Sequence, residues 1–174
     1  MSLTAAAVLV AAVIGLLNLA LALAMIRRLR DHETRLAGLE PRFSAPLGSR
    51  IGTFSATSTR GVPLSADSLP ARATIGVFAP GCEPCHRQLP DFVAYARQLD
   101  DPVAVVLTGG GDHAELVARL EEACHVVLEP LGGPVSVALQ VVATPTLMRV
   151  QDGVVTAVES VVTKLRASEA VAPA

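Results

Sequence analysis

Aromatic residues and lysine are scarce in this 174-residue chain, which has no tryptophan, one tyrosine, four phenylalanines and one lysine beside thirteen arginines. So few aromatic side chains give little material for the pocket of a large cofactor such as haem. The three cysteines, Cys82, Cys85 and Cys124, make only one Cys-x-x-Cys pair, whereas most structural zinc sites use two. The net charge is −2, without the clustered basic face of a nucleic-acid-binding protein. Low lysine with abundant alanine, valine and arginine is typical of a GC-rich bacterial source.

Charged residues are absent from the first 26 positions. Residues 5–26 form an apolar run interrupted only by one glycine and one asparagine. At about 1.5 Å per helical residue, this run spans a hydrocarbon core of roughly 30 Å. The tip, residues 1–4, has no basic side chain, and the run is long for a signal peptide, although alternating alanines near its end leave cleavage as the alternative. We predict one transmembrane helix and a single-pass protein of the cell membrane.

The segment after this run carries five arginines and three acidic residues in positions 27–42. By the positive-inside bias, these arginines would keep the following domain in the cytoplasm. Residues 41–50 are rich in proline, glycine and serine, which is typical of a linker. We therefore predict a juxtamembrane stalk and linker over 27–49, a folded domain over 50–168 and a disordered tail over 169–174.

Strand and helix patterns alternate through the predicted domain. Short apolar runs at 73–79 and 103–108 predict buried strands, each followed by a helical pattern. Asp152 and Gly153 predict a tight hairpin turn. The order predicts an α/β domain with a mixed sheet. The other expected elements are strands at 52–56, 125–128, 146–150 and 154–159, a capped turn at 65–69, and helices at 82–99, 112–123 (capped by Asp112), 134–140 and from 161.

The pair Cys82 and Cys85 follows a predicted strand and opens a predicted helix. Free N–H groups and the helix dipole at that end stabilise a thiolate on Cys82. Cys85 lies one turn further, within reach of a disulfide. Glu83 would raise the pKa of the neighbouring thiol and a protonated His86 would lower it, unless both are ordinary surface residues. The arrangement suits a reversible dithiol with Cys82 as the exposed nucleophile.

Two other chemistries fit the same residues. The Cys-x-x-Cys-His pattern of Cys82 to His86 is that of haem c attachment, with Met148, His113 or His125 as a possible second axial ligand. A zinc site would need Cys124 and His125 as further ligands, without the usual spacing. The preceding strand and the scarcity of aromatics disfavour haem. We predict that Cys124 is a buried core thiol, with a third redox cysteine as the alternative.

Residues 78–90 (FAPGCEPCHRQLP) resemble the active-site segment of thioredoxin-fold proteins. The closest resemblance is to membrane-anchored TlpA/ResA-like or MauD-like thiol-disulfide oxidoreductases. Pro90 matches the proline that kinks the active-site helix, and residues 143–146 (ATPT) match the cis-proline loop. Residues 54–69 resemble the added N-terminal hairpin of the TlpA-like branch. The resemblance covers about residues 47–165 and the single anchor.

This resemblance implies a thioredoxin-like fold that uses no cofactor. It implies that Cys82 attacks a disulfide of a client protein and that Cys85 resolves the mixed disulfide. It further implies a cis bond before Pro145 and pairing of the client with the backbone of Thr144. A second partner would recharge the dithiol. The domain would be extracytoplasmic, where disulfides are made and repaired, in conflict with the arginine signal.

The sequence also departs from the family pattern. Gly81 stands where thioredoxin has tryptophan, and Glu83 is a TlpA-like feature that favours a reducing or isomerising role. Ala79 replaces the threonine of peroxiredoxins, so we expect no peroxidase activity. A different hypothesis is a non-catalytic docking or chaperone module for a maturing protein. Serine at both Cys82 and Cys85 would leave such docking intact and abolish catalysis.

Overall fold

The computed structural model describes residues 45–168 together with residues 12, 14–16, 18 and 25. The chain divides into two units, Met1–Pro41 and Arg42–Ala174, and the fold below is that of the second. None of the helices among the described residues has the length and apolarity to cross a membrane. Most of the predicted transmembrane run and stalk, and the whole tail, lie outside the described residues, so these assignments stay predictions.

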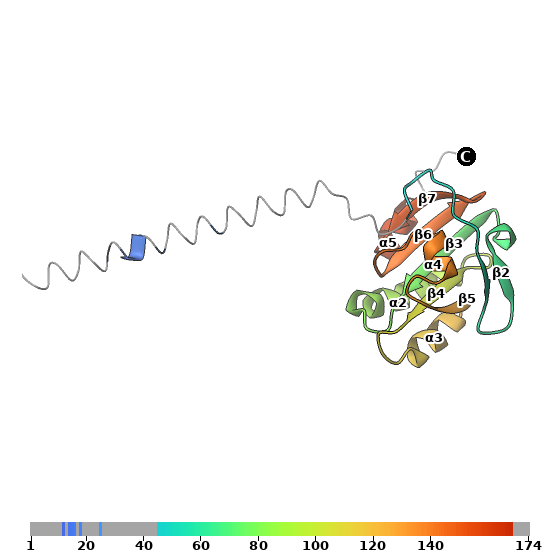
Figure 1. The fold of residues 1–174 in the computed structure, drawn as a ribbon, viewed down its shortest axis with the longest axis horizontal. Helices are drawn as coiled ribbons and strands as arrows, with labels where there is room; N and C mark the ends of the chain where they lie inside the picture. Colours follow the sequence, from blue (N-terminus) through green and yellow to red (C-terminus); the bar gives the residue numbers. More distant parts are fainter. Residues whose placement is uncertain (1–11, 13, 17, 19–24, 26–44, 169–174) are drawn as a thin grey trace, which may run out of the picture. The chain divides into compact units, whose positions relative to one another are not determined.

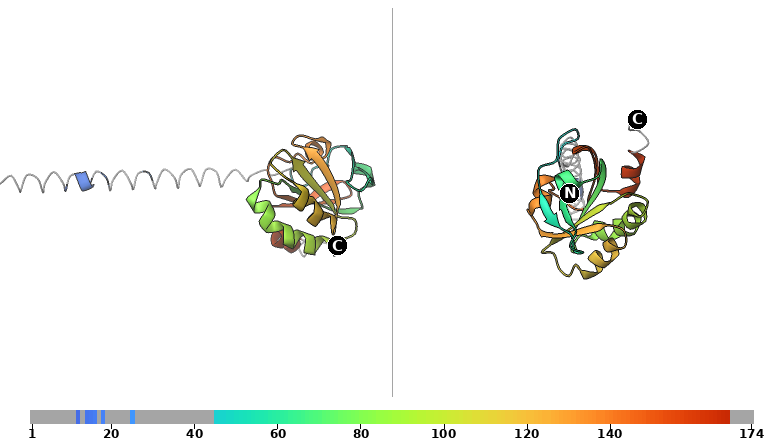
Figure 2. Two further views of the ribbon diagram at one scale, coloured as in Figure 1. Left: turned by 90° about the horizontal axis from the view of Figure 1, so that it is seen from below. Right: turned by 90° about the vertical axis from the view of Figure 1, so that its right-hand side faces the viewer.

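A five-stranded mixed sheet in the order β5-β4-β3-β6-β7 forms the centre of the domain (Figures 1 and 2). Strands β3, β4 and β5 are parallel, and β6 and β7 add in antiparallel fashion. The predicted α/β class with a mixed sheet is confirmed. The strands are β3 (Arg72–Phe78), β4 (Val103–Thr108), β5 (His125–Pro130), β6 (Thr146–Gln151) and β7 (Val154–Glu159).

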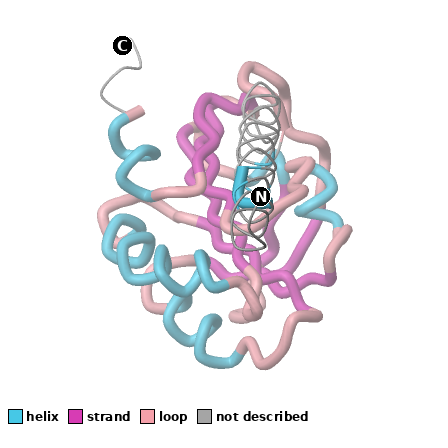
Figure 3. The backbone as a smooth tube through the Cα atoms, turned by 90° about the vertical axis from the view of Figure 1, so that its left-hand side faces the viewer, coloured by secondary structure: helices cyan, strands magenta, loops and turns pink. Residues whose placement is uncertain are grey.

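Among the described residues of this domain, four helices flank the sheet: α2 (Glu83–Ala96), α3 (Ala114–Glu121), α4 (Pro134–Ala138) and α5 (Val162–Ala167). Successive side chains of a strand point to opposite faces of the sheet. The apolar side chains of the strands therefore contribute to two hydrophobic cores, one on each face. On one face, Phe78 packs with buried residues of α2, α3 and α5, the three helices gathered on one side in Figure 3. On the other face, Ile75 and Val77 pack with α4 and the N-terminal segment.

The β6–β7 turn has the backbone that its sequence predicts. Asp152 has φ 50° and Gly153 has φ 76°. A two-residue hairpin turn of the type that matches strand twist needs positive φ at both positions, which asparagine, aspartate and glycine tolerate best. The predicted turn is confirmed. It reverses the chain after β6, so that β7 pairs with β6 in the antiparallel sense.

The N-terminal part of the domain is a small hairpin, β1 (Ser55–Thr57) and β2 (Pro63–Ser65), followed by the 3-10 turn η1 (Ala66–Ser68). Ser65 and Ser68 cap this turn reciprocally through their hydroxyl groups. The predicted hairpin and capped turn are confirmed, although β1 starts at Ser55 rather than at residue 52.

Residues 45–49, which the composition placed in the linker, contact the domain. Ala45 is buried, and its N–H donates to Leu139 O at 2.9 Å. The N–H of Gly48 donates to Val155 O at 2.8 Å. The folded part therefore begins before the predicted boundary at residue 50.

Some predicted bounds were wrong at their ends. Helix α2 ends at Ala96 because residues 98 and 99 make shorter turn-type hydrogen bonds. His113 occupies the N-cap position of α3 but makes no side-chain cap bond, whereas the carboxylate of Asp112, the predicted cap, accepts from Ala114 N–H at 2.9 Å. Strand β5 runs two residues further than expected, to Pro130. Helices α3 and α4 each stop two residues early, at Glu121 and Ala138.

Gly76 lets helix α2 approach the centre of the sheet. A Cβ at this position would lie 2.6 Å from Phe92 Cζ and 2.7 Å from Phe78 Cε2. These fully buried rings pack edge to face, with centroids 5.1 Å apart. We expect Gly76→Ala to lower the free energy of unfolding by about 2 kcal/mol, because a methyl group would overpack this contact. Urea denaturation would measure the loss, and an unchanged midpoint would show that the rings can move aside.

Candidate active site

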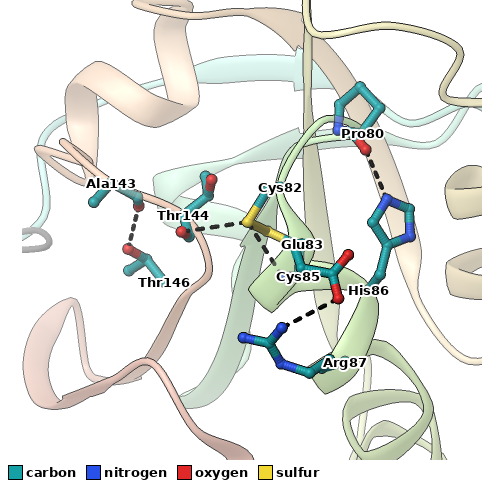
Figure 4. The surroundings of a disulfide bond; sticks show 9 residues. All are labelled: Pro80, Cys82, Glu83, Cys85, His86, Arg87, Ala143, Thr144 and Thr146. Carbon is teal, nitrogen blue, oxygen red and sulfur yellow. Dashed lines mark hydrogen bonds and ion pairs between the residues drawn. A yellow bond between two sulfur atoms is a disulfide. The ribbon is translucent and has the colours of Figure 1, made fainter.

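Cys82 is the N-cap of α2, at the end of the short turn that follows β3 (Figure 4). Its backbone is extended, with φ −100° and ψ 101°, and its Sγ accepts a hydrogen bond from Cys85 N–H at 3.2 Å. The N-terminal N–H groups of a helix lack partners within the helix. The fold therefore places the Cys82 sulfur where a negative charge is stabilised.

A disulfide joins Cys82 to Cys85, whose Cα atoms are 5.2 Å apart. The two cysteines differ in access, since Cys85 is fully buried and Cys82 is partly exposed. A partner thiol or disulfide can therefore reach Cys82 from outside, whereas Cys85 can react only with Cys82. The expected order, with Cys82 attacking and Cys85 resolving, needs this difference in access, and the order itself stays a prediction.

The loop before β6 lies over the disulfide, although it is 62 residues away in sequence. The Thr144–Pro145 peptide bond is cis, as the resemblance implied. The carbonyl oxygen of Thr144 lies 3.4 Å from Cys82 Sγ, and Thr146 Oγ1 donates to Ala143 O at 2.7 Å (Figure 4). In the reduced protein, a Cys82 thiol could donate to the Thr144 carbonyl. The antiparallel pairing of β6 with β3 brings this loop to the disulfide.

Glu83 is paired with Arg87 rather than left as a lone charge. Arg87 Nη1 lies 3.1 Å from Glu83 Oε1, and both side chains are mostly exposed. Sequence reasoning missed Arg87, although its i,i+4 spacing from Glu83 on a helix could have indicated the pair. The positive charge of Arg87 offsets part of the effect that Glu83 has on the sulfur.

His86 is held by the backbone of the preceding loop. Its Nε2 lies 2.7 Å from Pro80 O, and because a carbonyl only accepts, Nε2 is the donor. Figure 4 shows the ring directed toward Pro80. His86 thus ties the first turn of α2 to the loop that carries Cys82. Its predicted effect on the thiol stays a prediction.

Gly81 is explained by a close backbone contact with the triglycine loop, residues 109–111. A Cβ at Gly81 would lie 2.9 Å from Gly110 O. A bulky residue in place of Gly81 would need the loop to move away. The sequence predicted only a turn at residues 109–111. It did not indicate that this turn lies beside the active-site cysteines.

Cys124 is a core thiol, as predicted. It is buried and free, and burial raises the pKa of its thiol to about 12. The thiol is therefore protonated and poorly nucleophilic near neutral pH. A role for Cys124 as a third redox cysteine is not favoured.

The residues named for a metal or a haem do not come together. Met148 is fully buried in β6, His113 caps α3, and His125 lies in β5 with Nε2 3.6 Å from Asp101 Oδ1. In the described part of the chain, no three His, Cys, Asp or Glu side chains are grouped to hold a metal ion. These positions favour neither the zinc nor the haem interpretation.

Known folds resemble this chain more clearly than known sequences do. No protein-family model and no curated protein matches the sequence. StoA from Bacillus subtilis is similar in structure, with 17% identity, a TM-score of 0.54, and coverage of 68% of this chain and 96% of StoA. A thiol:disulfide interchange protein from Bacteroides sp. has 16% identity, a TM-score of 0.56, and coverage of 72% and 88%. A thio-disulfide isomerase from Thermus thermophilus has 15% identity, a TM-score of 0.56, and coverage of 75% and 100%.

These similarities define the class of fold. The domain has the thioredoxin-like α/β fold that the resemblance implied, with a mixed sheet and flanking helices. In this fold the Cys82–Cys85 disulfide lies at the start of α2, under the loop of the cis-proline bond.

Proposed function

We propose that the protein is a thiol-disulfide oxidoreductase that exchanges disulfides with a client protein. The observation that carries the proposal is the disulfide between partly exposed Cys82 and buried Cys85 at the N-terminus of α2. Solved structures of similar fold include a thiol:disulfide interchange protein and a thio-disulfide isomerase, which adds support.

In the reducing direction, the Cys82 thiolate attacks one sulfur of a client disulfide. A Cys82–client bond forms, the client disulfide breaks, and the second client sulfur leaves as a thiolate. The Cys85 thiolate then attacks the Cys82 sulfur, which forms the Cys82–Cys85 disulfide and releases the first client sulfur. Two electrons pass from the dithiol to the client, and the reverse sequence oxidises a client dithiol.

The contacts of Cys82 support its role as the nucleophile. The Cys85 N–H, 3.2 Å from Sγ, stabilises a Cys82 thiolate, as does the dipole of the 14-residue helix α2. The nearby Thr144 carbonyl is positioned to accept from the protonated thiol. We propose that the Thr144–Pro145 segment also receives the client backbone, as an added strand.

We further propose a TlpA-like or MauD-like protein that is tethered to the membrane through residues 5–26, with its domain outside the cytoplasm. The apolar run supports the tether, and the resemblance to TlpA-like proteins supports the location of the domain. A separate redox partner would return the dithiol to its working state. A reporter that is active only in the cytoplasm, fused to the C-terminus, would contradict this location if it were active.

Equilibration of the full-length protein across glutathione ratios would test the activity. Thiols would be alkylated and counted by mass spectrometry. We expect one reversible two-electron transition, confined to Cys82 and Cys85, while Cys124 stays a thiol. Its midpoint would separate a reductant from an oxidant, since about 30 mV corresponds to a tenfold change in equilibrium. Permanently free cysteines would contradict the proposal and favour the docking module.

The Glu83–Arg87 ion pair should have only a small effect on the midpoint reduction potential of the Cys82–Cys85 disulfide. Glu83→Gln removes a negative charge beside the thiolate, stabilises the reduced form and should raise the reduction potential. Arg87→Gln should lower it. Because both side chains are exposed, we expect shifts of no more than about 20 mV in either direction. The same glutathione titration measures both variants, and shifts of equal sign would rule out an electrostatic cause.

A further inference from the structure

A cavity of about 240 Å³ lies at the end of the parallel strands opposite the disulfide. It is lined by residues 62–64 of the hairpin, by residues 68–70 at η1 and just after it, and by Asp101, Val103 and His125. Val103 and His125 begin β4 and β5, whereas Cys82 follows the carboxyl end of β3, which is parallel to them. At about 3.3 Å per residue, the six residues of β4 span roughly 16 Å. The cavity is therefore separate from the active site.

The hairpin wall of this cavity is held against the sheet by hydrogen bonds. The N–H of Val62 donates to Oγ of the buried Ser58 at 3.0 Å. The N–H of Thr59 donates to Val126 O of β5 at 2.7 Å, and Figure 1 shows the hairpin beside β5. Most of the lining side chains are apolar. Sites for small molecules are usually preformed and mostly apolar, with a few polar groups that fix the ligand, and this cavity has that character.

A single carboxylate provides the charge of the cavity. Among the described residues that line it, Asp101 is the only acid, and no arginine or lysine lines it. The side chain of Asp101 is 76% exposed, and in the described part of the chain no arginine or lysine forms an ion pair with it. His125 Nε2 lies 3.6 Å from Asp101 Oδ1, which is too far for a good hydrogen bond. The carboxylate is therefore accessible to a cation in the cavity.

His125 adds a second acceptor to this wall. Its Nδ1 is buried and has no hydrogen-bond partner among the described residues. Because Nε2 faces the carboxylate of Asp101, the one proton of a neutral ring belongs on Nε2, and Nδ1 is then an acceptor without a donor. The polar part of the wall is thus a carboxylate beside a neutral imidazole, with a net charge of about −1. This combination favours a ligand that carries N–H donors and a positive charge, and it disfavours an anion.

We propose that this cavity binds a small organic cation, namely an amine or amidine with an apolar body of about one ring. The ring packs against the apolar wall that includes Leu64 and Val103, and the N–H groups donate to the carboxylate of Asp101. An apolar cavity of about 150 Å³ holds one benzene molecule, so a cavity of about 240 Å³ admits a ring with one polar substituent. The site does not include Cys82 or Cys85, so this inference does not depend on the proposed function.

Titration of the full-length protein with four probes would test the binding: benzamidine, uncharged benzyl alcohol, anionic benzoate, and guanidinium, which has the charge without the ring. The chain has four histidines, and labelling their Cε1 atoms with ¹³C gives each an NMR signal, with that of His125 assigned from His125→Gln. We expect benzamidine to shift the His125 signal with a Kd of about 1 mM, while the signals of His86 and His113 stay in place. Each other probe should bind about fivefold more weakly or less. No saturable shift, or benzoate binding as tightly as benzamidine, would overturn the proposal.

Two neighbouring acids give a matched pair of variants. Asp101→Asn and Asp100→Asn each remove one negative charge from an exposed residue, but Asp100 does not line the cavity. Asparagine tolerates the left-handed backbone of Asp101, with φ 48°, so this variant changes the charge without straining the turn. We expect Asp101→Asn to weaken benzamidine about fivefold and to leave benzyl alcohol unchanged, while Asp100→Asn alters neither. Unchanged binding in Asp101→Asn, or an equal loss in both variants, would overturn the proposal. Cys82→Ser should bind benzamidine as the wild-type protein does, and loss of binding there would overturn the assigned location.

Discussion

Serine at position 82 is expected to abolish disulfide exchange, with a loss of roughly 1,000-fold or more against a peptide disulfide. Cys82 is the only member of the disulfide that a partner can reach, because Cys85 is fully buried. A hydroxyl group in place of the thiol cannot form or accept a disulfide bond. The measurement is the rate at which the reduced protein reduces a symmetrical disulfide-linked peptide dimer.

The variant Cys85→Ser should behave differently from Cys82→Ser. It keeps the nucleophile and loses the resolving thiol, so the mixed disulfide with the client should accumulate instead of turning over. Intact-mass spectrometry under non-reducing conditions would show the added mass, and a reductant would remove it.

The matched control is Cys124→Ala. Cys124 is buried, with its pKa raised to about 12, and takes no part in the Cys82–Cys85 disulfide. This variant should keep the wild-type rate of exchange. Exchange that persists in Cys82→Ser and disappears in Cys124→Ala would reverse the assignment of the nucleophile.

The parts of the fold that could be predicted are those with local signals. The apolar run of β4 gave its bounds correctly, because residues 103–107 are buried on both faces of the sheet. The turn at Asp152 and Gly153 followed from two residues that tolerate positive φ. Cys82 and Cys85 were found because their spacing and the start of a helix are features of the same short segment.

The parts that could not be predicted depend on contacts between distant segments. Gly110, Leu131 and Val142 line one cavity of about 380 Å³, although they come from three separate connections of the chain. Arg87 was missed although its i,i+4 spacing from Glu83 is a local signal, because the spacing alone does not fix how the two side chains are oriented. Strand β5 was expected to end at Leu128 because the next residue, Glu129, is charged, and a charged residue normally ends an apolar run.

Glu129 is nevertheless one of the most buried polar residues of the domain, with 4% of its surface exposed. Its carboxylate accepts from Val135 N–H at 2.9 Å and from Ser136 N–H at 2.6 Å. These are first-turn N–H groups of α4, which lack partners within the helix. A Cβ at Gly133 would lie 2.7 Å from Glu129 Oε2, so the loop closes tightly over the carboxylate.

Replacing Glu129 with alanine is expected to lower the free energy of unfolding by about 3 kcal/mol or more. The change leaves two buried N–H groups without acceptors and opens a cavity under Gly133. Glu129→Gln should cost less, because its amide keeps one oxygen as an acceptor while its NH₂ group faces a donor. Urea denaturation followed by circular dichroism measures both variants.

Glu115→Ala provides the control, since Glu115 is an exposed acid in the first turn of α3. Its loss should cost less than about 1 kcal/mol. Equal stability of Glu129→Ala and the wild-type protein would show that α4 is held by its apolar contacts alone.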